Sequence, residues 1–256
     1  MTVLTIARST FREAARDRVL YSPAVFAVLM TGAAILVGQV SIGIERQVVI
    51  NLGLAAVTFF GVIVAILVGT GLVAKEIQKR TLYTVLSRPV ERWQFVAGKF
   101  VGLAGTLAIN GGLMGLGLLA ALRYVSPGFS GADAWVLVAV YFILLQLLMV
   151  CGLALLFSTF SSPLLAGVSS FALFVLGNFA QELRDVAQSG AGWVHPLMVG
   201  ATYLMPNFSA FNVAAGVAHG ESIASLLILH NSIYAVTYTG MVLCAAVLAF
   251  EWRELQ

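Results

Sequence analysis

The side chains best suited to a specific contact are concentrated between Lys75 and Lys99, in the stretch KEIQKRTLYTVLSRPVERWQFVAGK. Glu76 precedes Lys79 by three residues and Arg80 by four, a spacing at which opposite charges stabilise a helix. An apolar edge and a helix-breaking proline follow, at Leu82, Val85, Leu86 and Pro89. A second helix is predicted to restart around Glu91 and to run into the next apolar segment. A short amphipathic helix with an apolar edge and charges around it suits docking onto another protein. The alternative is a basic loop that only holds anionic lipid head groups.

The same segment resembles the permease subunits of type-two ABC transporters, the exporter-like class. That family carries an acidic residue after its second span, then a Gly-Thr pair, an apolar patch, a Ser-x-Pro turn, an arginine and a Gly-Lys pair. The matching positions are Glu76, Thr81, Leu82, Leu86, Ser87, Pro89, Arg92, Gly98 and Lys99. Arg80 departs from the family, which often has glycine there. The resemblance implies that residues 75–94 form a cytosolic coupling segment, whose coupling helix docks into a groove on an ATPase subunit.

The sequence lacks an ATP site of its own. A P-loop needs G-x-x-x-x-G-K-[ST], whose backbone N–H groups cradle phosphate. Gly98-Lys99 is followed by Phe100 and has Trp93, not glycine, five residues before Gly98. We therefore expect no cofactor and no enzymatic activity on this chain, with ATP and Mg²⁺ bound by a partner. The resemblance implies two copies of a cytosolic ABC ATPase subunit and a second permease copy, in a homodimer or a heterodimer.

A second stretch, YLMPNFSAFN at residues 203–212, resembles the outer loop of one branch of this family. That branch contains the permease of the nitrous-oxide-reductase maturation exporter. Two other functions remain open at this stage. One is a non-transporting scaffold that uses the coupling loop to act on a periplasmic partner, and the other is a secondary carrier or channel. No lysine or carboxylate lies deep in an apolar segment, and ion-coupled carriers usually need one.

Catalytic and metal sites have weaker support. Ser130 in GFSG and His230 could form a serine nucleophile with its base, but Ser130 falls in a Pro/Gly turn outside the apolar segments. His195, Met198 and Met205 could bind copper, although such residues in an apolar loop usually serve packing. We expect no catalytic residue and no metal ligand.

Composition indicates that lipid is the solvent for much of the chain. Sixty per cent of the 256 residues are hydrophobic and only 10% are charged, whereas soluble domains carry roughly 25% charged residues. So few charges cannot cover a globular surface. We expect contact with membrane lipid and none with nucleic acid, in an all-α protein whose residues 1–256 form a single transmembrane domain.

Six apolar segments come close to the roughly 20 residues that a helix needs to cross a bilayer. They are Pro23 to about Ile44, Val48 to Ala74, Phe95 to Leu122, Ala134 to Phe157, Pro163 to Ala180, and about Ile223 to Phe250. Residues 1–21 are predicted to form an interfacial amphipathic helix. The outer loop, residues 181–222, is predicted to contain re-entrant or interfacial helices, because its apolar stretch 193–205 is too short to cross.

The positive residues set the expected orientation. With a cytosolic N-terminus, the inner side holds Arg8, Arg12, Arg16, Arg18, Lys75, Lys79, Arg80, Arg88, Arg92, Lys99 and Arg253, and the outer side holds Arg46, Arg123 and Arg184. This asymmetry predicts a multi-pass protein of the inner (plasma) membrane with both termini in the cytosol.

Small and polar residues inside the predicted spans indicate where helices meet. Gly98 with Gly102, and Gly111 with Gly115, are small-x-x-x-small pairs, which let helices approach closely within a subunit or across a dimer interface. Six amides lie in the spans: Gln39, Asn51, Asn110, Gln146, Asn178 and Asn231. Each is predicted to form an interhelical hydrogen bond, with a substrate contact as the alternative.

Overall fold

The computed structural model describes residues 2–16, 21–40, 44–78, 91–126, 133–189 and 205–252. Every regular element in these ranges is a helix. They are α1 (Thr2–Arg16), α2 (Ser22–Val40), α3 (Glu45–Gln78), α5 (Arg92–Val125), α6 (Asp133–Phe160), α7 (Pro163–Asn178), α8 (Ala180–Ser189), the 3₁₀ turn η2 (Ser209–Phe211), α10 (Ala214–Ala218) and α11 (Ser225–Trp252). The predicted all-α fold class is confirmed for this part of the chain.

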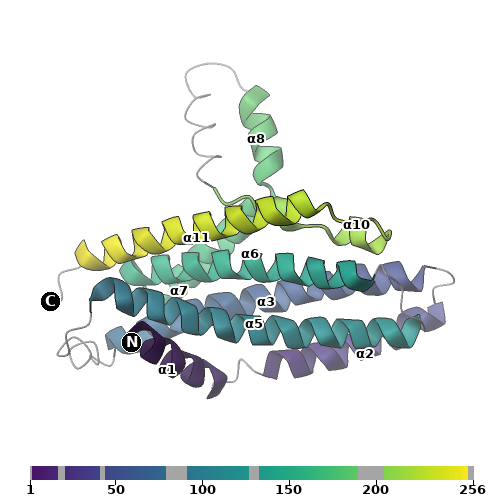
Figure 1. Cartoon of the computed structure of the whole chain (residues 1–256), viewed down its shortest axis with the longest axis horizontal. Coiled ribbons are helices and arrows are strands. Elements are labelled where there is room, and N and C mark those ends of the chain that lie inside the picture. Colours follow the sequence, from purple (N-terminus) through teal and green to yellow (C-terminus); the bar gives the residue numbers. More distant parts are fainter. Residues whose placement is uncertain are drawn as a thin grey trace.

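The long helices form one elongated bundle (Figure 1). Helices α2, α3, α5, α6, α7 and α11 lie along its long axis, and α6 lies at the centre in contact with α3, α5, α7 and α11. Helix α1 lies at the end of the bundle where α11 finishes, and we call this the terminal end. The opposite end, where α3 and α6 begin, is the far end.

Four helices are long and apolar enough to cross a membrane, among the residues that the structure describes. Their apolar parts are Glu45–Gly71, Trp93–Val125, Asp133–Phe160 and Ser225–Phe250. These correspond to the second, third, fourth and sixth predicted spans. The first and fifth predicted spans also form apolar helices, α2 and α7, which are shorter; the 16 residues of α7 extend for about 24 Å, against a hydrocarbon core of about 30 Å.

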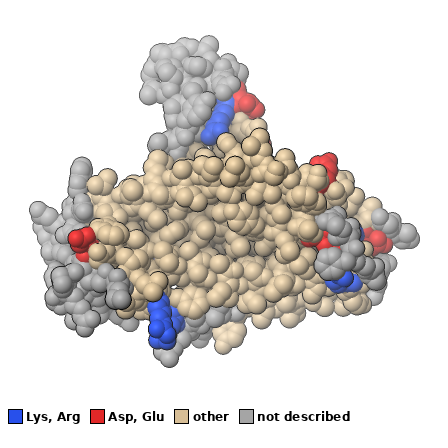
Figure 2. Space-filling model, viewed as in Figure 1, with Lys and Arg blue, Asp and Glu red and all other residues tan. Residues whose placement is uncertain are grey.

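The described charges leave a wide uncharged surface around the middle of the bundle. Figure 2 shows Lys, Arg, Asp and Glu at the two ends of the molecule and on α8, with other residues between them. Many of the residues between are large exposed apolar side chains, such as Leu67 on α3, Val168 on α7 and Val236 on α11. A surface of this kind suits contact with lipid.

Helix α1 is amphipathic as predicted, and its apolar face is covered by α5. Ala7 and Ala14 are buried, while Arg8 and Arg12 are exposed. A new helix begins at Ser22, whose hydroxyl donates a hydrogen bond to Asn110 Oδ1 at 3.0 Å. Asn110 is in the middle of α5, so Ser22 contacts α5 halfway along its length. Helix α1, which precedes Ser22, covers the first part of α5, and α2, which begins at Ser22, covers the second part.

The register of the central helices follows from their close contacts. Gly61 of α3 faces Leu147 of α6, and Arg46 pairs with Asp133 at the far end, so α3 and α6 run parallel. Helix α5 runs antiparallel to both. Its first residue is Arg92 with Glu91 as N-cap, which confirms the predicted restart of a helix around Glu91.

The predicted outer loop, residues 181–222, is partly described. Helix α7 ends at Asn178, and α8 leaves the side of the bundle at a steep angle (Figure 1). Residues 205–218 then fold back onto the bundle through η2 and α10. We call residues 205–218 the capping segment. Most of the apolar stretch 193–205 lies outside the described residues, so its predicted re-entrant helix stays a prediction.

Candidate functional site

Most residues predicted to contact an ATPase lie outside the described part of the chain. They are Thr81, Leu82, Leu86, Ser87 and Pro89. The backbone at both edges of this segment is described: Glu76 lies in the last turn of α3, and Arg92 is the first residue of α5. Along the backbone, the segment therefore joins the end of α3 to the start of α5.

Helix α1 contacts the first turns of α5 at backbone distance. A Cβ atom added at Gly98 would lie 3.0 Å from the carbonyl oxygen of Val3, and one at Gly102 would lie 2.6 Å from that of Ala7. A backbone oxygen cannot rotate away as a side chain can, so the absence of a Cβ at both positions sets the distance between the helices. The structure places this glycine pair at a helix contact within the chain.

A neighbouring face of the same turns of α5 contacts the end of α11. The rings of Phe95 and Phe250 stack with centroids 6.0 Å apart and planes 18° apart. Lys99 is only 2% exposed, and its Nζ lies 5.1 Å from the centroid of the Phe95 ring. An aromatic face stabilises a desolvated ammonium through its quadrupole. The start of α5 is thus held by α1 on one face and by α11 on the next.

The second glycine pair lies farther along α5 and faces α6. A Cβ atom added at Gly111 would overlap Leu144, and one at Gly115 would lie 3.0 Å from Cγ1 of Val140. This pair also lies at a helix contact within the chain.

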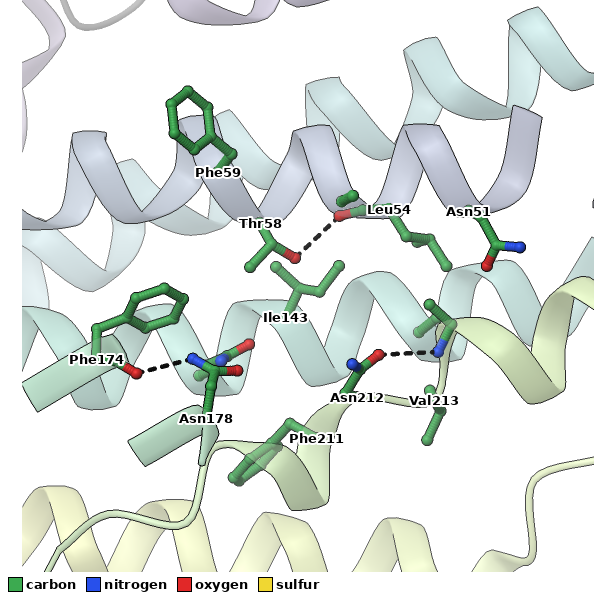
Figure 3. A pocket seen from close by; sticks show the side chains of 14 residues that line it. Asn51, Leu54, Thr58, Phe59, Ile143, Phe174, Asn178, Phe211, Asn212 and Val213 are labelled. Atoms are coloured by element: carbon green, nitrogen blue, oxygen red, sulfur yellow. Dashed lines mark hydrogen bonds between the residues drawn. The ribbon is translucent and has the colours of Figure 1, made fainter. Parts of the chain in front are cut away.

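A pocket of about 350 Å³ opens between α3, α6, α7 and the capping segment, closer to the far end. Helix α7 stops at Asn178, so it covers only part of the groove between α3 and α6. Figure 3 shows Thr58 of α3 and Ile143 of α6 pointing toward one another, with Asn178 from α7 and Asn212 from the capping segment at the edge. The pocket is lined by apolar side chains and uncharged polar ones, and none of its lining residues is charged.

The capping segment is fixed to the bundle by a close approach at Gly177. The backbone N–H of Phe208 donates to the carbonyl oxygen of Gly177 at 2.9 Å. A Cβ atom added at Gly177 would lie 2.6 Å from the carbonyl oxygen of Pro206 and 2.5 Å from the Phe208 ring. The absence of a side chain at Gly177 therefore lets residues 206–208 lie directly on the end of α7.

Helix α11 holds the other side of the capping segment. Asn231 Nδ2 donates to the carbonyl oxygen of Ala210 at 2.8 Å, and the backbone N–H of Asn207 donates to the Tyr234 hydroxyl at 2.8 Å. The Phe211 ring lies edge-on to Phe142 of α6, with centroids 6.2 Å apart. These contacts make the capping segment an ordered part of the bundle.

The amides inside the apolar helices differ in their partners. Asn110 and Asn231 each make a hydrogen bond between segments, as the sequence predicts. Asn178 bonds within its own helix, to the carbonyl oxygen of Phe174. Gln146 is only 5% exposed and lines the pocket. Sequence reasoning identified it as an intramembrane amide but not as part of a pocket, because that depends on where α7 stops.

The described residues add little support for a catalytic site or a metal site. His230 is an exposed residue of α11, while Ser130, His195 and Met198 lie outside the described residues. Within the described ranges, no group of three or more His, Cys, Asp or Glu side chains could hold a metal ion.

One known protein family matches nearly the whole chain. A family model described as ABC-2 family transporter protein matches residues 4–253. No curated protein sequence matches the chain. The family match spans the bundle, the segment between α3 and α5, and the capping segment. The chain therefore belongs to the ABC-2 family of transporter proteins, as a multi-pass membrane component of an ABC transporter.

Proposed function

We propose that this protein is the permease subunit of an ABC exporter whose ATP-hydrolysing subunit is a separate cytosolic chain. Family membership supports an ABC permease, and the sequence contains no P-loop of its own. ATP and Mg²⁺ would then bind to the partner. Two copies of the permease, identical or different, with two ATPases would form the complete transporter, because one bundle of six spans supplies half of a pathway.

In this proposal α2 and α7 are the two remaining spans, and the terminal end faces the cytosol. The excess of Lys and Arg on that side supports this orientation. The location would be the inner (plasma) membrane. The 34 residues of α5 give a length of about 51 Å, so α5 extends beyond a hydrocarbon core of about 30 Å and carries α1 at the interface.

The observation that carries the proposal is the way the start of α5 is held. The predicted coupling residues, Glu76 to Arg92, directly precede this helix. Its first turns are in backbone contact with α1 at Gly102 and are stacked on α11 through Phe95 and Phe250. A displacement of the coupling segment by a closing ATPase would therefore move α1, α5 and α11 together.

Copurification with candidate ABC ATPases tests the proposal. We expect one ATPase to bind, and a Glu76/Leu82/Leu86 triple alanine variant to lose that binding and any transport phenotype. The matched control replaces Glu182, Leu226 and Leu229 by alanine. It removes the same residue types from exposed positions away from the terminal end, and should leave binding unchanged.

Two results would contradict the proposal. One is that no ATPase binds and the coupling triple variant transports normally. The other is transport in liposomes that contain the chain alone without ATP, which would indicate a secondary carrier or channel.

Placement in the branch of the nitrous-oxide-reductase maturation permease stays a prediction. Loss of a periplasmic partner with intact transport, on deletion of residues 193–212, would instead support the scaffold function.

A further inference from the structure

The side chain of Gln146 has an unusual position for an amide in an apolar helix. It lies in α6 at 5% exposure and faces the pocket between α3 and α7. No hydrogen bond joins its amide to any other residue in the described part of the chain. A buried amide without a partner costs about 1–3 kcal/mol. The geometry therefore leaves both a donor and an acceptor available to a molecule in the pocket.

Other polar groups around the pocket also have unused hydrogen-bonding capacity. Asn178 uses Nδ2 for the Phe174 carbonyl, which leaves its Oδ1 as an acceptor. Thr58 donates to the Leu54 carbonyl, so its hydroxyl oxygen can still accept. Asn51 and Asn212 are exposed at the rim. Donors and acceptors of this uncharged kind match hydroxyl groups, which also donate and accept.

The walls of the pocket and its size restrict the ligand further. Phe59, Phe174 and Phe211 contribute aromatic surface, and no lining residue carries a charge that could neutralise a charged group. Burying an unpaired charge is far more costly than burying a hydrogen-bonded neutral group. A volume of about 350 Å³ is at the lower end of the range of roughly 300–1,000 Å³ for small-molecule sites, so it fits one head group.

Part of the exposed rim of the pocket is apolar. Ala55 and Phe59 line it from the exposed face of α3, within the apolar part Glu45–Gly71. A ligand bound there with its polar group at Gln146 can extend an apolar chain outward along α3. A molecule with a neutral polar head and an apolar tail satisfies both surfaces at once.

We propose that the pocket binds the uncharged, hydroxyl-bearing head group of an amphiphile, with Gln146 as its central hydrogen-bonding residue. As an assignment of the transported substrate class, this rests on the proposed function. Binding itself does not depend on an ATPase, so it can be measured on the chain alone.

Photo-crosslinking in nanodiscs tests the proposal. The probes are a diazirine-bearing alkyl glucoside and, with the same chain, an alkyl phosphocholine and an alkyl sulfate. We expect the glucoside to label residues 51–59, 139–146 and 174–178 in preference to the charged probes. Gln146→Met should lower that labelling about 3- to 10-fold, the effect of one lost hydrogen bond to a neutral group. Ala55→Leu, which fills the mouth from an exposed helix position, should lower it as well.

Gln94→Met is the matched control, because it makes the same change at the terminal end of α5, away from the pocket. It should leave labelling unchanged. Without glucoside, Gln146→Met should unfold at the same temperature as the parent or higher, because it removes an unpartnered buried amide. We expect competition by alkyl glucoside but not by soluble methyl glucoside. Equally effective competition by methyl glucoside would identify a soluble glycoside as the ligand and would overturn the proposed amphiphile.

Three further outcomes would overturn the proposal. Equal labelling by all three probes, insensitive to Gln146→Met, would mean ordinary lipid contact with a pocket that holds only water. Preferential labelling by a charged probe would refute the neutral class. A large loss of stability in Gln146→Met without ligand would make the amide a structural group. Failure to find an ATPase, by contrast, would refute transport and leave the binding result standing.

Discussion

Arg46 donates from Nη2 to Oδ1 of Asp133 at 2.6 Å and thereby joins the first turn of α3 to the first turn of α6. The two side chains differ in exposure, 27% for Arg46 and 4% for Asp133. Because α3 and α6 form the back of the pocket, this ion pair fixes the register of its two longest walls.

The ion pair predicts that replacing Arg46 destabilises the protein more than replacing Asp133. Arg46→Met leaves a carboxylate buried without this partner, which costs about 3 kcal/mol or more. Asp133→Asn leaves the less buried guanidinium, which can reach water at the far end, and should cost about 1–2 kcal/mol. Thermal unfolding in one detergent measures both. If the two variants lose equal stability, or Asp133→Asn loses more, the difference in burial does not determine the cost of each substitution.

The contact of α1 with α5 predicts that Gly102→Ala is harmful. The new Cβ atom would lie 2.6 Å from the Ala7 carbonyl oxygen, so α1 must shift away. We expect a loss of about 1–3 kcal/mol in unfolding free energy and, under the proposed function, weaker coupling between ATP hydrolysis and transport.

Gly112→Ala on the same helix is the control, since a Cβ there meets nothing within 4 Å. Alanine is a better helix former than glycine, so this variant should be unchanged or more stable by up to about 1 kcal/mol. If Gly102→Ala and Gly112→Ala change the unfolding free energy equally, the close contact with α1 is not the reason that alanine is harmful at residue 102.

The close approach at Gly177 predicts that Gly177→Ala detaches the cover of the pocket. Alanine would displace Pro206 and weaken the hydrogen bond from the Phe208 N–H to the Gly177 carbonyl. We expect hydrogen exchange at residues 205–218 to accelerate about 5-fold or more, while α3 and α6 keep their protection. Gly240→Ala, which has open space around its Cβ, should leave exchange in the capping segment unchanged. Faster exchange throughout the bundle would mean global destabilisation and not local release.

The sequence alone determined the solvent, the element type and the family of this protein. Low charge content and long apolar runs require lipid around helices, and this follows from composition without knowledge of packing. A helix start around Glu91 is predicted from local backbone chemistry, and α5 begins at Arg92 accordingly. The motif from Glu76 to Lys99 was recognisable because its spacing along the chain carries the information.

Only the tertiary structure decided which side chains meet. The glycine pairs on α5 look alike in sequence, yet Gly102 faces α1 and Gly111 faces α6, because the neighbours of a helix face are set by the packing of distant segments. The amides Asn110 and Gln146 also look alike, but Asn110 bonds to Ser22 while Gln146 faces a pocket. That pocket exists because α7 stops at Asn178 and residues 205–218 fold back at Gly177, which depends on contacts between segments about 30 residues apart.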